Sequence, residues 1–124
     1  MKIVLLFLWI IPISLMTQNK YDNIWLLGYT SDNQRTLLDF TNSQLNIQTG
    51  QSNIDLDPTN TSICDKDGNL LFYSNGCEIA NANHETMENG EVINPGMMEQ
   101  IYCPSQGINW PHGVLALPYP ESDS

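Results

Sequence analysis

The residues best suited to metal chemistry lie in the segment 84–88, His-Glu-Thr-Met-Glu. It is similar to the zinc motif H-E-x-x-H, in which two His residues on one helix face bind the metal. The fifth residue is Glu88 in place of the second His, and the flanking Asn83 and Asn89-Gly90 favour a loop over a helix. His112 is the remaining candidate ligand. The pattern therefore favours surface loop residues over a zinc site.

Three polar residues at alternating positions, Asp65, Asp67 and Asn69, match the first half of an EF-hand calcium loop. An EF-hand needs Gly at the sixth position and Glu at the twelfth, where this chain has Leu70 and Gly76. The pattern thus favours a turn over a metal site. Calcium binding stays an alternative, because the chain carries 14 acidic residues against 4 basic ones.

Hydrolase chemistry has only weak signals. Ser74 in YSNG and Ser105 in PSQG lack the G-x-S-x-G elbow that presents a nucleophilic serine. Two acidic pairs suit a glycosidase acid and base, but turns explain their spacing equally well: Asp55/Asp57 and Asp65/Asp67. Four aromatic residues suit a carbohydrate or peptide groove, although aromatic residues on short strands more often belong to a core: Trp25, Tyr29, Tyr73 and Trp110. We therefore predict no catalytic, cofactor-binding or metal-binding residue.

Several of these residues lie in the stretch 61–81, TSICDKDGNLLFYSNGCEIAN, which carries the clearest structural signal of the chain. Asp67-Gly68 between two apolar runs predicts a β-hairpin with a type I′ turn, which needs φ > 0 at both central positions. Counting outward from this turn pairs Lys66 with Asn69, Cys64 with Leu71 and Ile63 with Phe72. Asn75-Gly76 predicts a second turn, and a third short strand should follow it.

The rest of the chain predicts further short strands and turns. The second hairpin arm, 70–73, is apolar on both of its faces, so we expect both faces to be covered. Apolar residues alternate with polar ones on either side of Thr49-Gly50-Gln51, which predicts a half-exposed hairpin over 45–56. Asn89-Gly90 predicts another tight turn. The remaining expected strands are 23–29, 36–40, 101–103 and 113–117.

The N-terminus predicts export. Met1-Lys2 and the apolar run 3–16 fit a signal peptide over residues 1–18, since a membrane span needs about 20 apolar residues. Once this segment is removed, we expect no membrane span. The remaining chain then has three basic residues, Lys20, Arg35 and Lys66, and all 14 acidic residues. Phosphate binding relies on clusters of Lys and Arg, so nucleic acid and anionic membrane surfaces are excluded as expected partners.

Three cysteines are an odd set for an exported chain, in which disulfides form readily. Cys64 lies in the middle of an expected strand and suits a small buried side chain. Cys77 follows a turn and Cys103 lies in a loop-rich region, so they are the better disulfide pair. Three unpaired thiols remain the alternative.

Several pieces of the chain resemble a family of large secreted Bacteroidota proteins. They are NIWLLGY at 23–29, SICDKDGNLLFYSNG at 62–76, IANANHETMENG at 79–90, NPG at 94–96 and LALPYP at 115–120. Members of that family carry a C-terminal type IX secretion sorting domain, and their N-terminal part resembles a β-propeller. The resemblance implies a fold and a secreted or cell-surface location, and it implies no biochemical activity. It also implies that the chain is the first part of a longer protein.

Together these features predict an all-β fold. We expect short antiparallel strands and hairpins over 19–124, forming the incomplete first part of a propeller-like domain behind a signal-peptide helix. The expected function is a non-catalytic binding or structural module whose partner is an extracellular ligand or the rest of the parent protein. The alternatives are a fragment of an extracellular hydrolase acting on glycans or peptides, and a calcium-stabilised scaffold.

Overall fold

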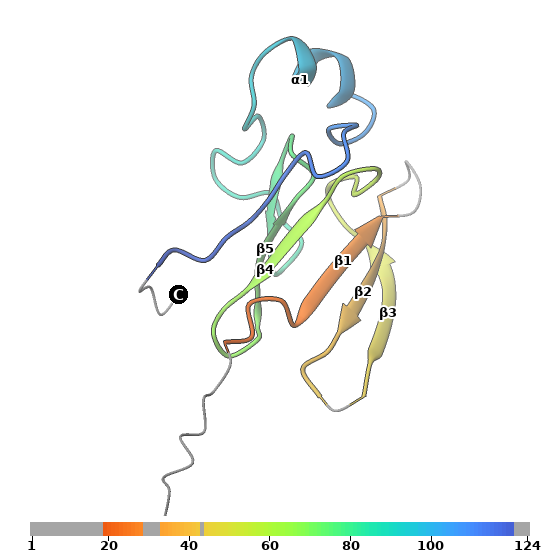
Figure 1. Ribbon diagram of the computed structural model, residues 1–124. Helices are drawn as coiled ribbons and strands as arrows, with labels where there is room; N and C mark the ends of the chain where they lie inside the picture. The colour runs from red at the N-terminus through yellow and green to blue at the C-terminus, as the bar shows by residue number, and fades with distance from the viewer. Residues whose placement is uncertain (1–18, 29–32, 43, 121–124) are drawn as a thin grey trace, which may run out of the picture.

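The computed structural model describes residues 19–28, 33–42 and 44–120. The predicted signal segment 1–18 and Tyr29 lie outside these residues. The described chain forms two three-stranded antiparallel sheets and one short helix, so the predicted β-rich fold is confirmed (Figure 1). Among the helices that the structure describes, none is long and apolar enough to cross a bilayer.

The first sheet contains β1 (Ile24–Gly28), β2 (Gln34–Asp39) and β3 (Asn46–Gln51), hydrogen-bonded in that order. β1 and β2 cover the two N-terminal strands that the sequence predicts. The sheet has two unlike faces because side chains alternate along each strand. One face carries Leu26 toward the second sheet, and the opposite face carries the half-exposed Trp25.

The hairpin predicted over 45–56 is wrong. β3 runs straight through Thr49-Gly50-Gln51 and pairs Gly50 with Arg35 of β2. A Cβ atom on Gly50 would lie 3.3 Å from a guanidinium nitrogen of Arg35, so this glycine makes room for a side chain and does not form a turn. Ile54 and Leu56 belong to the connection between the sheets, where each is only 1% exposed.

The second sheet contains β4 (Thr61–Cys64), β5 (Leu70–Ser74) and β6 (Ile79–Asn81). The predicted register holds at Ile63, which lies opposite Phe72, but it is wrong nearer the turn. The predicted pairs there were Cys64 with Leu71 and Lys66 with Asn69, whereas Asn69 bonds to Asp65. A bulge then shifts the pairing toward the turn, so that Cys64 lies opposite Leu70. β6 pairs with β5 on the other side, which gives the predicted three-stranded arrangement.

The turn between β4 and β5 differs in type from the prediction. The backbone N–H of Gly68 donates to the carbonyl oxygen of Asp65 (3.1 Å), and the N–H of Asp65 donates to the carbonyl of Asn69 (2.8 Å). Only Gly68 has a positive φ, 94°, and Asp67 does not. This is a type I turn followed by a left-handed glycine, the usual form of a three-residue hairpin loop. The Asp65 carboxylate favours it by accepting the N–H groups of Asp67 and Asn69.

The other two predicted turns are present. At Asn75-Gly76 the glycine has φ 84°, and the Asn75 side-chain oxygen accepts the N–H groups of Cys77 and Glu78, both at 2.9 Å. At Asn89-Gly90 the N–H of Gly90 donates to the carbonyl of Met87 (2.8 Å), and Asn89 takes the positive φ of 59°. Asn tolerates this conformation better than most residues with a side chain.

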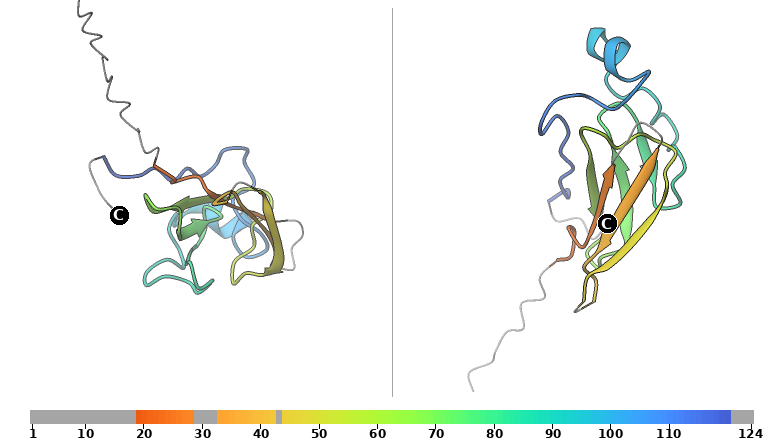
Figure 2. Two further views of the ribbon diagram at one scale, coloured as in Figure 1. Left: turned by 90° about the horizontal axis from the view of Figure 1, so that it is seen from below. Right: turned by 90° about the vertical axis from the view of Figure 1, so that its right-hand side faces the viewer.

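Two predicted strands near the C-terminus are wrong. Residues 101–103 lie at the end of the helix α1 (Met97–Tyr102), whose Met, Glu and Gln residues have good helix propensity. Residues 113–117 run beside β4 without joining a ladder, because their one bond to it goes from the Ala116 N–H to the Thr61 hydroxyl (3.2 Å). Figure 2 shows α1 and its loops at one end of the two sheets.

The core lies between the two sheets, where β1 and β4 are neighbours (Figure 1). The Cys64 N–H donates to the carbonyl of Tyr21, and the Ser62 hydroxyl donates to the carbonyl of Ile24, each at 2.8 Å. β4 therefore runs antiparallel to β1. The prediction that 70–73 is covered on both faces holds only in part, because Leu71 is 37% exposed. The core residues are Leu26, Ile54, Leu56, Tyr73 and Ala80, with Ile24 and Leu70 packed against them.

Candidate functional site

The residues of the zinc-like segment are not gathered around a metal position. His84 has φ 67° and places Nδ1 3.2 Å from the Tyr73 hydroxyl oxygen. Glu88 and His112 are exposed. Over residues 19–28, 33–42 and 44–120, no three His, Cys, Asp or Glu side chains lie together as a metal site would require.

The two serines weighed as nucleophiles have structural partners. The Ser74 hydroxyl is buried, donates to the carbonyl of Glu78 (2.7 Å) and accepts the N–H of Gly76 (3.0 Å). The Ser105 hydroxyl is exposed and makes a long contact, 3.5 Å, to the carbonyl of Tyr102, which also accepts the Ser105 N–H at 3.2 Å. The Ser74 hydroxyl therefore holds the turn after β5 in place.

The acidic pairs also cap loops. The two carboxylate oxygens of Asp65 accept three bonds of 2.9 Å, from the N–H groups of Asp67 and Asn69 and from the Asn69 side-chain amide. The bonds from Asn69 hold the pKa of Asp65 below its usual value. Asp55 accepts the N–H of Asp57 in the same way (3.0 Å). The alternating Asp and Asn residues thus stabilise turns.

Cys77 and Cys103 form a disulfide, with their Cα atoms 5.6 Å apart, and this is the pair that the sequence favoured. It ties the turn after β5 to the residue that follows α1. Cys64 is a free, fully buried thiol, and burial raises its pKa. A buried thiol of raised pKa has little of the reactive thiolate form, so Cys64 packs as a small apolar residue.

The aromatic residues do not share one groove. Tyr73 is fully buried in the core, and Trp25 lies against Phe40 on the outer face of the first sheet, with ring centres 5.3 Å apart. Trp110 is 57% exposed and lines a separate apolar hollow beside α1 with Met97 and Ile108. Tyr73, Trp25 and Trp110 therefore lie at three separate positions and do not line one groove.

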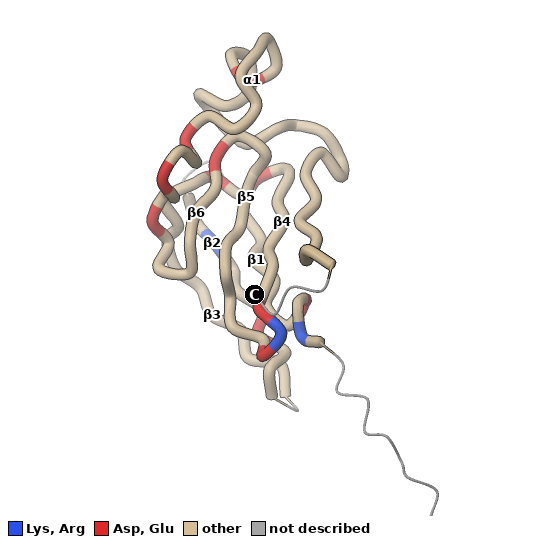
Figure 3. The backbone as a smooth tube through the Cα atoms, turned by 90° about the vertical axis from the view of Figure 1, so that its left-hand side faces the viewer, with Lys and Arg blue, Asp and Glu red and all other residues tan. Residues whose placement is uncertain are grey.

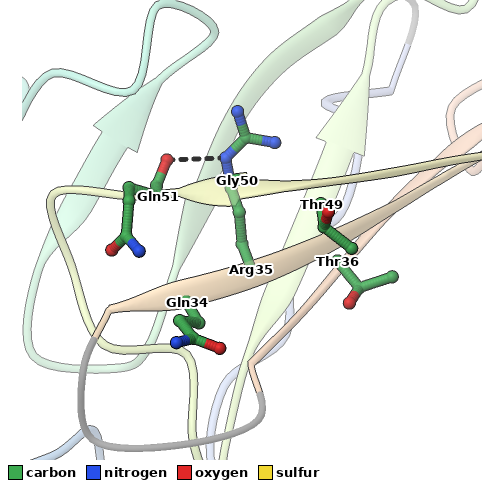
Figure 4. A pocket seen from close by; sticks show the side chains of 6 residues that line it. All are labelled: Gln34, Arg35, Thr36, Thr49, Gly50 and Gln51. Atoms are coloured by element: carbon green, nitrogen blue, oxygen red, sulfur yellow. Dashed lines mark hydrogen bonds between the residues drawn. The ribbon is translucent and has the colours of Figure 1, made fainter.

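Arg35, Tyr73 and His84 form a polar group that joins the two sheets, since Tyr73 and His84 share a hydrogen bond and the Arg35 charge acts on both. Arg35 lies on β2 between two glycines, Gly28 of β1 and Gly50 of β3, which face it in register. Its Nε donates to the backbone carbonyl of Gln51 (2.8 Å), so the side chain crosses over β3 (Figure 4). In the described part of the chain, Arg35 forms no ion pair with a carboxylate.

The charge of Arg35 acts on the two residues of the second sheet. Burial is the main reason that the pKa of His84 is lowered, and repulsion from Arg35 adds to it. Burial raises the pKa of Tyr73, and the same Arg35 charge opposes this rise. Burial and the Arg35 charge therefore both favour the neutral form of His84. A cationic position of this kind attracts an anion, and most other charges on the chain are acidic (Figure 3).

A polar hollow of about 400 Å³ borders the same part of the first sheet. Figure 4 shows Gln34, Thr36 and Gln51 pointing to one side of the strand pair and Arg35 crossing to the other. β3 is the last strand of this sheet, and five of its six residues are exposed. The residues that line the hollow are Gln34, Arg35, Thr36, Thr49, Gly50 and Gln51.

The sequence did not indicate Arg35 as a site residue. Its position depends on the pairing of β2 with β3, which the predicted turn at Thr49-Gly50-Gln51 replaced with a hairpin. A glycine inside a strand is itself a signal, because it often marks the close approach of another group. His84 was considered only as a metal ligand, and its contact with Tyr73 links residues 11 positions apart.

Comparisons of this chain with protein-family models, with curated proteins and with solved structures found no match.

Proposed function

We propose that the chain is a non-catalytic binding and structural module of an exported protein, and that it forms part of a propeller-like domain. The observation that carries this proposal is an uncovered apolar strip beside β4. Leu115, Leu117 and Tyr119 are 74%, 72% and 80% exposed, and they alternate with the half-buried Val114 and Ala116. Such alternation is typical of a strand whose outer face packs on another layer.

The direction of this segment supports the same arrangement. Trp110 accepts a hydrogen bond from Thr59, and Ala116 donates one to Thr61, so 110–116 runs parallel to β4. Blades of a propeller repeat by rotation, so their equivalent strands run in the same direction. The meander β4-β5-β6 followed by 113–119 fits one blade and the first strand of the next.

The first sheet supports only a looser analogy. β1 runs opposite to β4, so β1-β2-β3 is not a strand-for-strand rotational copy of β4-β5-β6. Its outer face is nevertheless apolar and uncovered at Trp25, Leu27 and Ile47, which are 49%, 40% and 59% exposed. Exposed apolar patches of this kind mark interaction surfaces. The outer face of the first sheet and the apolar strip beside β4 are therefore both suited to packing against further layers.

The location of the protein is part of the proposal. The resemblance to secreted Bacteroidota proteins and the apolar segment 3–16 favour export to the exterior or the cell surface. The Cys77–Cys103 disulfide is compatible with an oxidising compartment. N-terminal sequencing of exported protein should give a start between Thr17 and Lys20, and a start at Met1 in a membrane fraction would contradict export.

The apolar strip can be tested by sedimentation velocity. We expect the protein with residues 19–124 to self-associate, because no described segment covers the strip, and we expect Leu115→Ser/Leu117→Ser to shift it toward monomer. Met97→Ser is the matched control, since Met97 is 75% exposed on α1. A protein that stays monomeric and melts sharply, or an equal effect of the control, would contradict the packing proposal.

A further inference from the structure

The outer edge of β3 has the features of a peptide-binding edge. β3 has the sequence NIQTGQ, without the Lys, Pro or bulge that usually protects an edge strand from pairing. β2 occupies one of its sides, and no described strand pairs with the other side. An edge of this kind accepts an extended peptide as an added strand.

The register shows which β3 residues face the open side. The N–H of Ser52 donates to the carbonyl of Asn33 (2.9 Å), so this pair is of the hydrogen-bonded type. Hydrogen-bonded pairs alternate along an antiparallel ladder, so Gly50 and Gln48 turn their N–H and C=O groups toward β2. Ile47 and Thr49 then present theirs to the open side, where a peptide backbone would bond.

Arg35 reaches that edge from the neighbouring strand. Its side chain crosses β3 above Gly50, and its Nε is fixed by the carbonyl of Gln51, 2.8 Å away (Figure 4). The two terminal guanidinium nitrogens donate to no residue that the structure describes. A peptide residue opposite Gly50 would project its side chain on the same face as Arg35, where Gly50 has no side chain to block it.

We propose that the free edge of β3 binds an extended peptide, and that Arg35 pairs with the carboxylate of an Asp or Glu side chain opposite Gly50. The charge fits, because an Arg–carboxylate pair is a strong, often bidentate interaction and Arg35 lacks an ion-pair partner in the described chain. His84 and Tyr73 lie on the other side of the Arg35 guanidinium, toward the second sheet. This inference does not depend on the packing proposed for the apolar strip, which lies beyond β4.

The test uses the full chain with its disulfide intact and a fluorescent peptide, acetyl-Thr-Val-Glu-Val-Thr-amide, read by anisotropy. We expect saturable binding that falls at least about fivefold when the peptide Glu is replaced by Gln, since bonds to charged groups are the stronger ones. Arg35→Gln should remove this preference, and Arg35→Lys should restore part of it. Lys66→Gln removes a cation from another part of the surface and should change nothing.

A separate variant tests the hydrogen bonds from the β3 backbone to the peptide. Thr49→Pro removes an N–H that faces the open side and leaves the β2 ladder intact, so it should abolish binding while circular dichroism stays unchanged. In the bound wild-type protein the NMR-measured pKa of His84 should rise, because the carboxylate offsets the Arg35 charge. Tyr73 and Arg35 are the groups facing His84 that affect this value.

Three outcomes would overturn the proposal. The first is equal binding of the Glu and Gln peptides, or equal binding by Arg35→Gln and wild type. The second is displacement by methyl glucuronide at concentrations where acetylglutamate amide has no effect, which would assign the carboxylate to an acidic sugar. The third is a dimer that forms through β3, is lost in Thr49→Pro and excludes the peptide.

Discussion

The two sheets share one topology, three antiparallel strands in sequence order, but they differ in how their residues are held. In the second sheet every residue from Tyr73 to Cys77 is buried, and side chains of Asp65 and Asn75 cap its turns. In the first sheet β3 is exposed except at Gly50. Ladder hydrogen bonds are therefore common to both, and burial and turn capping concentrate in the second sheet.

The largest loss of stability is expected for a substitution of Tyr73. Tyr73→Ala empties the fully buried position between the sheets and should reduce the free energy of unfolding by about 3–5 kcal/mol, as for other large-to-small core changes. Ile47→Ala on β3, where the side chain is 59% exposed, should cost less than about 0.5 kcal/mol. Urea unfolding measures both. Similar losses for the two variants would show that the sheets are equally important to stability.

The next effect concerns the disulfide. Cys77 and Cys103 are 26 positions apart, so their bond restricts the unfolded chain and contributes about 3 kcal/mol. The double variant Cys77→Ala/Cys103→Ala should lose this amount, and wild-type protein unfolded under reducing conditions should match it. Peptide mapping without reduction checks the connectivity. A linkage through Cys64, or an unchanged unfolding midpoint after reduction, would contradict the assignment.

Turn chemistry gives a smaller effect. Gly68 has φ 94°, and an added Cβ would lie 2.8 Å from the Asn23 side-chain nitrogen. Gly68→Val should therefore cost about 1–3 kcal/mol through backbone strain. Gly50→Ala in the first sheet is the control: its φ is ordinary and an added Cβ would meet only the end of the Arg35 side chain, at 3.3 Å, so we expect about 0.5 kcal/mol. Equal melting of Gly68→Val and wild type would contradict the turn.

The same contrast explains which elements the sequence predicts well. Gly68 and Gly76 both take positive φ, and the register of Ile63 with Phe72 follows from the pairing of two short apolar runs. These are local features, and local residue chemistry decides them. The type of the first turn was still wrong, because the Asp65 carboxylate bonds to the loop backbone and favours a type I turn.

Elements that depend on distant partners were predicted poorly. Gly50 resembles a turn residue until β2 is placed beside it, and 113–117 resembles a strand although its one bond to β4 goes to a side chain. The contact of Arg35 with Gln51 requires the pairing of β2 with β3, and that of Tyr73 with His84 requires the pairing of β5 with β6. The candidate site therefore becomes visible only when the register of both sheets is known.

The smallest expected effect concerns calcium at Asp65, Asp67 and Asn69. A ligand that binds only the folded state stabilises it by RT ln(1 + [L]/Kd), so 10 mM calcium acting on a site with a Kd of about 1 mM would add about 1.4 kcal/mol. That amount would raise the melting temperature by several degrees in a domain of this size. We expect no such rise, because the Asp65 carboxylate already accepts three hydrogen bonds from its own loop. Differential scanning calorimetry in calcium, in magnesium and in a chelator measures the difference.

The matching variant separates a turn cap from a metal ligand. Asp65→Ala removes bonds to the N–H groups of Asp67 and Asn69, so it should cost about 1–2 kcal/mol, in the range of lost side-chain caps. If the carboxylate serves only the turn, this loss is the same with calcium and with a chelator. A melting temperature that rises with calcium in wild type but not in Asp65→Ala would instead assign a cation to this loop. A bound cation would then contribute to the stability of the second sheet. The hydrogen bonds described above instead stabilise this turn with groups of the chain alone.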